Sequence, residues 1–377
     1  MMELETLLEQ VESILTSPLD CLRRYHSQGK KVFGILPYHF PEELLYAMGI
    51  IPMGLWGADL KVEHSKEYFP SFFCGLLQSE MEMILSHRLE ELDGIILTEM
   101  CDSLKSFSLN VMSARKDLNF YTYPQSMNRK SPSANLYMIK KSEELLKKIS
   151  FDLSLSFTQQ GLRESIEVYN ENRRLLKEFS CLCASHMRTI TPMVRNHIFK
   201  CGYFLDRKEH NQLLRKINSI LCQLPVEKGH YVRVVTTGIL MDNLEILDCM
   251  DRYHIRVVDD DIAMESRNLS LVEGKDMQSL IHHYLDMKGM SVLENSRNQR
   301  TKKLLDLVRD SDADGVVYFM TKFCDPEEYD FPFVRNELEK EGVPCILIEV
   351  DKTVGGLGQA ETILEAFSEN GYGQHNG

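Results

Sequence analysis

The chain contains two closely similar stretches, Leu92-Asp-Gly-Ile-Ile-Leu-Thr-Glu-Met-Cys-Asp102 and Ala313-Asp-Gly-Val-Val-Tyr-Phe-Met-Thr-Lys-Phe-Cys-Asp-Pro326. Each begins with Asp-Gly, continues as an apolar run typical of a buried strand, and ends in a Cys-Asp pair. Cys101 and Cys324 therefore occupy matching places in an apparent duplicated unit. Duplication would place the two strand ends on opposite sides of one cleft, so we expect both thiols at a shared site.

The duplication includes the neighbouring segments. In each half, a strand, a short helix and a second strand precede the Cys-Asp stretch, and a final strand follows it. The first-half segments are Lys31–Leu36, Pro41–Met48, Ile51–Trp56 and Asn119–Tyr123. The second-half segments are Tyr231–Gly238, Asn243–Met250, Ile255–Asp260 and Pro344–Val350. Strands that alternate with helices indicate a parallel sheet covered by helices on both faces.

These patterns predict an α/β fold with two parallel-sheet lobes joined by a helical segment. A chain of 377 residues is long enough to build a separate core in each lobe. We place the first lobe at residues 1–134, the helical segment at 135–228 and the second lobe at 229–377, because residues between the two units have helical periodicity.

Charge and hydropathy exclude several classes of partner. The formal net charge of -13 argues against nucleic acid or an anionic membrane surface, both of which favour a basic face. No apolar run approaches the length of a membrane span. The N-terminal residues are acidic and amphipathic, unlike a signal peptide. We therefore expect a cytoplasmic protein.

Ten cysteines in a cytoplasmic chain are expected to be reduced rather than paired in disulfides. No CxxC pair occurs, so any metal site must combine distant segments. Seven cysteines lie in regular helical or strand patterns. For six of them we predict buried structural thiols. The seventh, Cys21, lies in a helical region and has no obvious partner. The seven are Cys21, Cys181, Cys183, Cys201, Cys222, Cys249 and Cys345.

Cys74 is the third candidate for the shared site. It lies in the loop Phe69–Gln78, directly before a predicted helix, where the helix N-terminus would stabilise a thiolate. Ligands of open parallel sheets bind beyond the carboxyl ends of the strands, where Cys101 and Cys324 are also expected. The alternative for Cys74 is a core thiol packed beside two phenylalanines.

Three convergent thiols without a nearby histidine pattern favour a soft metal site. An iron–sulfur cluster with one open iron, a zinc ion and no metal at all remain possible at this stage. Tyr38 and His39 follow the first strand and are weak candidates to line the cleft, although the sequence favours His39 as an ordinary loop histidine. We predict that Asp259–Asp261 are turn and cap residues, because consecutive strand residues point in opposite directions.

Nucleotide motifs are missing from the sequence. The segment Val354–Gly358 follows a strand but lacks the G-x-G-x-x-G order, so we expect a flexible loop rather than a dinucleotide site. The chain also contains no P-loop and is not expected to hydrolyse ATP.

Five segments together resemble the 2-hydroxyacyl-CoA dehydratases. They are Phe40-Pro-Glu-Glu43, Met48-Gly-Ile-Ile-Pro-Met-Gly-Leu-Trp56, Tyr68-Phe-Pro-Ser-Phe-Phe-Cys74, Met100-Cys-Asp102 and Lys322-Phe-Cys-Asp-Pro-Glu-Glu-Tyr-Asp330. More narrowly, the chain resembles the smaller beta subunit of the (R)-2-hydroxyisocaproyl-CoA and phenyllactyl-CoA type. Glu164–Arg173 and Thr237–Leu240 strengthen that narrower resemblance.

The resemblance implies two flavodoxin-like lobes and a [4Fe–4S] cluster held by Cys74, Cys101 and Cys324. It implies a heterodimer with a larger homologous alpha subunit, which would hold most of the acyl-CoA substrate. A separate ATP-dependent iron–sulfur activator would supply one electron, and water would leave the substrate through a ketyl radical, as in anaerobic amino-acid fermentation. Relatives tend to have an arginine where this chain has Ile363, so no role is transferred to the preceding loop.

Two other functions are compatible with the same residues. One is a component of a benzoyl-CoA reductase, and the other is a non-enzymatic electron-transfer iron–sulfur protein. A cluster protein that needs no larger homologue would favour the second, and turnover of a hydroxyacyl-CoA would exclude both.

Overall fold

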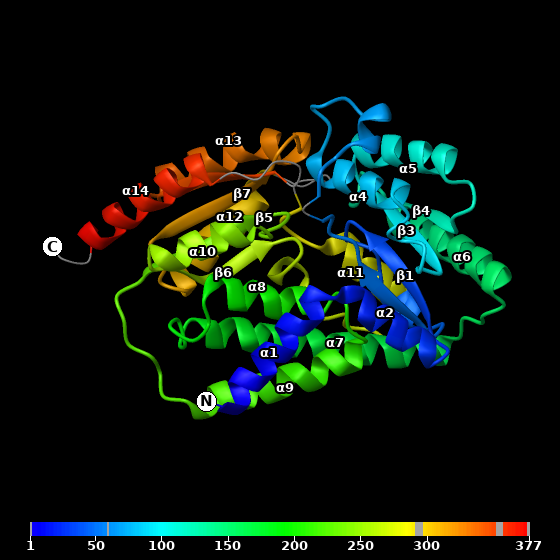
Figure 1. Ribbon diagram of the computed structural model, residues 1–377, viewed down its shortest axis with the longest axis horizontal. Helices are drawn as coiled ribbons and strands as arrows, with labels where there is room; N and C mark the ends of the chain where they lie inside the picture. Colours follow the sequence, from blue (N-terminus) through cyan, green and yellow to red (C-terminus); the bar gives the residue numbers. More distant parts are fainter. Residues whose placement is uncertain (1, 59, 291–296, 352–356, 375–377) are drawn as a thin grey trace.

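The computed structural model describes residues 2–58, 60–290, 297–351 and 357–374. In this part of the chain, eight strands form two separate four-stranded sheets, and all neighbouring strands are parallel. The sheets belong to two lobes that lie side by side, with helices of the central segment below them (Figure 1). The expected α/β fold with two flavodoxin-like lobes is confirmed.

Both sheets have the same strand order, which supports the predicted duplication. The first has the order β2-β1-β3-β4, formed by β1 (Lys31–Leu36), β2 (Ile50–Gly54), β3 (Gly94–Glu99) and β4 (Phe120–Pro124). The second has the order β6-β5-β7-β8, formed by β5 (Val232–Gly238), β6 (Ile255–Ile262), β7 (Gly315–Thr321) and β8 (Cys345–Val350). The central strands β3 and β7 are buried almost throughout, because helices cover both faces of a parallel sheet.

Helices surround the sheets and fill the region between them in the sequence. The first lobe has α3 (Glu43–Tyr46), η1 (His64–Glu67), α4 (Gly75–Leu85) and α5 (Asp102–Ala114), preceded by α1 (Met2–Thr16) and α2 (Pro18–Ser27). The central helices are α6 (Ala134–Leu153), α7 (Gln159–Cys183), α8 (Pro192–Cys201) and α9 (Arg207–Gln223). The second lobe has α10 (Leu244–Arg252), η2 (Ser266–Asn268), α11 (Met277–Asp286), α12 (Arg297–Asp310), α13 (Asp325–Lys340) and α14 (Gly358–Gln374).

One hydrophobic core connects the two lobes through the central helices. It includes Val32 of β1, Phe179 of α7, Ile217 of α9 and Val234 of β5, all of which are fully buried. Separating the lobes would expose this apolar surface to water, at a large cost in free energy. The shared core therefore holds the strand ends of one lobe in a defined position relative to those of the other.

The prediction for Asp259–Asp261 was wrong. These residues lie inside β6, and Asp260 and Asp261 are buried. A register shift between Val234 and Val235 of the paired strand changes the local alternation of side chains. Arg195 of α8 pairs with Asp260, and Lys303 of α12 pairs with Asp261, so the buried carboxylates are neutralised by residues distant in sequence.

Three smaller predictions also need correction or lie outside the description. The helix expected at Pro41–Met48 is only the single turn α3. Cys181 and Cys222 lie in helices as expected, but they are exposed rather than buried. Most of the loop predicted at Val354–Gly358 lies outside the described residues.

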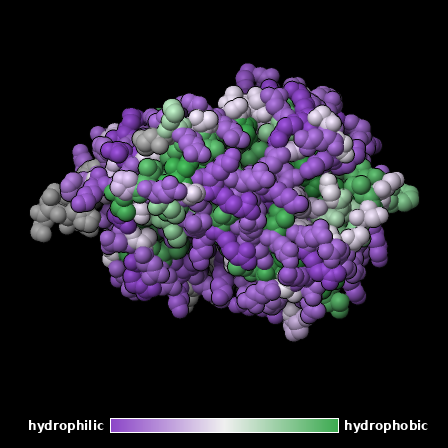
Figure 2. Space-filling view, turned by 90° about the horizontal axis from the view of Figure 1, so that it is seen from below, coloured by the Kyte–Doolittle hydropathy of each residue, from purple (hydrophilic) through white to green (hydrophobic). Residues whose placement is uncertain are grey.

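The molecular surface is mainly hydrophilic on the face shown in Figure 2, where apolar residues form small separate patches. Among the described residues, no helix combines the length and apolar character needed to cross a bilayer.

Gly238, at the end of β5, has a φ of +139° and lies against the neighbouring strand. A Cβ atom there would be 2.2 Å from the carbonyl oxygen of Phe319 in β7. We expect Gly238→Ala to destabilise the protein by about 3 kcal/mol, because the strands must move apart. Gly29→Ala is the control: its φ is +73° but no atom lies within 4 Å. Urea unfolding should show a much smaller loss for Gly29→Ala, and equal losses would contradict the steric explanation.

Candidate metal centre

The three candidate cysteines occupy equivalent positions in local structure. Cys74, Cys101 and Cys324 are the N-cap residues of α4, α5 and α13, respectively. Cys101 and Cys324 come shortly after the carboxyl ends of β3 and β7, as the duplicated stretches predicted. Each thiol therefore lies beside backbone N–H groups that have no partner inside the helix.

Cys74 and Cys101 of the first lobe are close enough to Cys324 of the second lobe to raise its pKa. Burial, with a smaller contribution from the neighbouring Cys101, raises the pKa of Cys74 to about 11. Burial also raises the pKa of Cys324 well above its ordinary value, with contributions from Cys74 and Cys101. The pKa of Cys101 is raised for the same principal reason, its burial.

The thiolate stabilisation expected from a helix N-terminus is present but is outweighed by burial. The backbone amides of Leu76 and Leu77 favour the Cys74 thiolate, and those of Ser103 and Leu104 favour that of Cys101. Desolvation has the larger effect and keeps the thiols protonated. Three such groups close together become good ligands when a positive centre compensates their charge. Among the described residues, no group of three or more His, Cys, Asp or Glu side chains is arranged around a single-ion site.

Tyr38 lies at the same site, whereas His39 faces elsewhere. Burial raises the pKa of Tyr38, and its surroundings include Arg267, Glu327 and Cys324 of the second lobe. The Tyr38 hydroxyl is buried and has no hydrogen-bond partner among the described residues.

The His39 ring contacts the ring of Tyr284, with centroids 5.5 Å apart. Burial, together with the nearby Arg129 and His283, lowers the pKa of His39 to about 3, so its imidazole is neutral at physiological pH. None of these neighbours is a candidate cysteine.

Comparison with known proteins identifies the family. Residues 37–370, which include all three cysteines, match the family model described as 2-hydroxyglutaryl-CoA dehydratase, D-component. The chain belongs to this family. The resemblance recognised from the sequence motifs is thereby confirmed.

The dehydratase relatives cover almost the whole chain. The (R)-phenyllactyl-CoA dehydratase beta subunit of Clostridium sporogenes is 33% identical over 365 residues, 95% of this chain and 96% of its own length. The (R)-2-hydroxyglutaryl-CoA dehydratase subunit beta of Acidaminococcus fermentans is 34% identical over 380 residues, 98% and 100% respectively. A benzoyl-CoA reductase component of Thauera aromatica is less similar, at 26% identity over 339 residues, or 87% of each chain.

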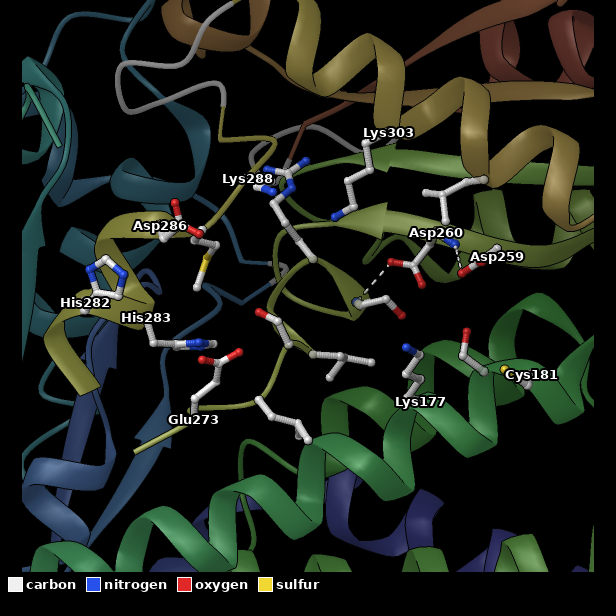
Figure 3. Close-up of a pocket in the computed structure, with 18 of the residues that line it drawn as sticks. Lys177, Cys181, Asp259, Asp260, Glu273, His282, His283, Asp286, Lys288 and Lys303 are labelled. Atoms are coloured by element: carbon white, nitrogen blue, oxygen red, sulfur yellow. Dashed lines mark hydrogen bonds between the residues drawn. The ribbon is translucent and has the colours of Figure 1, made fainter. Parts of the chain in front are cut away.

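A cavity of about 730 Å³ lies between α7, β6, α11 and α12, and none of the three candidate cysteines lines it. Lys177 and Lys303 extend into it from opposite walls, and Glu273 and Asp286 contribute acidic groups (Figure 3). The cysteine that lines this cavity is Cys181, which is not one of the three candidate metal ligands. Arg267, which is also a neighbour of Tyr38, lines the cavity.

The sequence interpretation missed a buried polar network beside Cys324. Arg300 of α12 pairs with Glu327, which lies in the first turn of α13, and both side chains are fully buried. A signal was available: Arg300, Leu304 and Val308 are spaced by four residues and share a helix face. Leu304 and Val308 are buried, so a charged residue on their face needed a buried partner.

The unpartnered hydroxyl of Tyr38 leads to a stability prediction for the metal-free protein. Tyr38→Phe should change the free energy of unfolding by less than about 0.5 kcal/mol, because no protein hydrogen bond is lost. Tyr123→Phe is the matched control, since Tyr123 is equally buried but forms a 2.9 Å hydrogen bond with Ser142. That control should lose about 1 kcal/mol in urea unfolding. A larger loss for Tyr38→Phe than for Tyr123→Phe would mean that its hydroxyl has a protein partner.

Proposed function

We propose that this chain is the beta subunit of an iron–sulfur (R)-2-hydroxyacyl-CoA dehydratase, and that Cys74, Cys101 and Cys324 hold a [4Fe–4S] cluster. The observation that carries the proposal is the convergence of three N-cap thiols from two lobes. When bound, the cluster would relay one electron toward ketyl-radical removal of water from the substrate, giving an enoyl-CoA.

The residues present fit such a group in their chemistry. Three thiols supply the soft ligands that iron–sulfur clusters require, and three rather than four leave one iron open to another ligand. The helix N-termini compensate part of the negative charge that the ligands bring. The buried hydroxyl of Tyr38 is available to donate a hydrogen bond at this site. The three cysteines are half-buried, which limits the access of water to the ligands.

The partners follow from the relatives rather than from the fold. Relatives are named as beta subunits of dehydratases, so we propose a heterodimer of this chain with a larger homologous alpha subunit. In this scheme the acyl-CoA binds mainly to the alpha subunit, and a cytoplasmic, ATP-dependent iron–sulfur activator provides the electron. The side chains of this chain then serve mainly to hold and tune the relay site.

A component of a benzoyl-CoA reductase is the second candidate. It is supported by the relative from Thauera aromatica, at 26% identity. The dehydratase relatives are 33% and 34% identical and cover more of the chain, which favours the first proposal.

Iron analysis of the anaerobically purified protein tests the cluster. We predict about four irons and four sulfides per chain, with most of both lost in Cys74→Ser, Cys101→Ser and Cys324→Ser. Cys345→Ser is the matched control, because Cys345 is also half-buried and belongs to β8 of the second lobe. Its iron content should equal that of the unchanged protein. Stoichiometric zinc, or iron that survives all three substitutions, would contradict the assignment.

Co-expression with the larger homologue from the same source tests the enzyme assignment. We expect the two chains to elute together and, with activator, ATP and reductant, to dehydrate a member of a panel of (R)-2-hydroxyacyl-CoA thioesters. A chain that binds iron but does not co-elute with the homologue would instead be an electron-transfer protein. Reduction of benzoyl-CoA without any dehydration would support the reductase.

A further inference from the structure

A buried ion pair lies one helical turn from Cys324. Both terminal nitrogens of Arg300 lie 3.3 Å from the carboxylate oxygens of Glu327, and both residues have no exposed surface. The hydroxyl of Tyr318 donates a further 2.6 Å hydrogen bond to the same carboxylate. Moving two charges from water into the protein interior is energetically costly. A buried ion pair therefore need not stabilise the fold, and stability alone does not explain this one.

Arg300 connects the start of α13 to the centre of the second sheet. Besides Glu327, its guanidinium donates hydrogen bonds to Asp330 of α13 and, at 3.1 Å, to Thr237 of β5. One cation therefore contacts two carboxylates on consecutive turns of the helix that Cys324 caps. Any movement of this helix start would break several buried hydrogen bonds at once.

Glu327 acts on Cys324 in two opposing ways. It is the third residue after the N-cap, so its backbone amide faces the thiol and favours the thiolate. Its carboxylate has the opposite effect, because a nearby negative charge disfavours ionisation of Cys324. The charge of the Glu327 carboxylate therefore acts on the sulfur, and Arg300 is the cation paired with that carboxylate.

We propose that Arg300 and Glu327 are positioning residues that fix the start of α13 and set the reduction potential of the group bound through Cys324. The inference rests on the proposed cluster. Because reduction adds one negative charge, the Arg300 cation favours the reduced state and the Glu327 anion opposes it. With the pair buried, little water is available to screen either effect.

Neutralising the two partners separately should shift the reduction potential in opposite directions. Arg300→Met removes the cation that lies among Glu327, Asp330 and Asp261, so the potential should become more negative. Glu327→Gln keeps the shape but removes the anion, so the potential should become less negative. Arg300→Lys retains the charge and should remain closer to the unchanged protein than Arg300→Met. A purely structural role would not produce shifts of opposite sign.

Arg195→Met is the matched control. Arg195 is also fully buried between two carboxylates, Asp260 and Glu265, but it belongs to α8 and contacts no candidate cysteine. Its loss should lower stability without shifting the potential.

The experiment is a redox titration of the anaerobic alpha–beta complex, followed by electron paramagnetic resonance of the signal that depends on Cys324. Shifts of opposite sign for Arg300→Met and Glu327→Gln support the inference. Shifts of the same sign, no shift in Glu327→Gln, or an equal shift in Arg195→Met would overturn it. If Arg300→Met does not fold, Glu327→Gln and Arg300→Lys decide the question. Absence of iron from the unchanged protein would instead reject the proposed function, and this inference with it.

Discussion

The placement of three half-buried thiols at the first turns of three helices is the constraint on which the rest of the site depends. Cys74 and Cys101 belong to one lobe and Cys324 to the other, so the site exists only when the lobes keep their relative position. The hydrophobic core that runs through the central helices maintains this arrangement. The two parallel sheets have the same strand order, so the carboxyl ends of β3 and β7 lie at corresponding edges of their sheets.

Burial makes the site electrostatically demanding. Each thiol has a raised pKa, and each would be repelled by its neighbours if all three lost their protons. In the proposed function, the free energy that a metal cluster gains from such ligands would compensate this cost. The lobe around Cys324 also contains buried charges that are neutralised within the protein, including Arg300 with Glu327 and Lys303 with Asp261. Under the proposed function, the Arg300–Glu327 pair would adjust the potential at the site without a change of ligands.

The sequence predicted the fold and the positions of the cysteines better than it predicted the surrounding charges. A buried parallel strand has a local signature, so the two Asp-Gly to Cys-Asp stretches were sufficient to locate β3 and β7 and the cysteines after their carboxyl ends. The local sequence around Asp261 is typical of a strand end, and that around Glu327 is typical of a helix start. Their burial depends on Lys303 and Arg300 of α12, which other elements separate from both acids in the sequence, and no local pattern identifies such partners.

The most direct test of the central claim is anomalous diffraction at the iron absorption edge from crystals of the anaerobically purified chain or complex. The account predicts a compact group of iron atoms bonded to the sulfur atoms of Cys74, Cys101 and Cys324, at the N-termini of α4, α5 and α13. Iron bound elsewhere on this chain, or a single zinc ion between these residues, would contradict it.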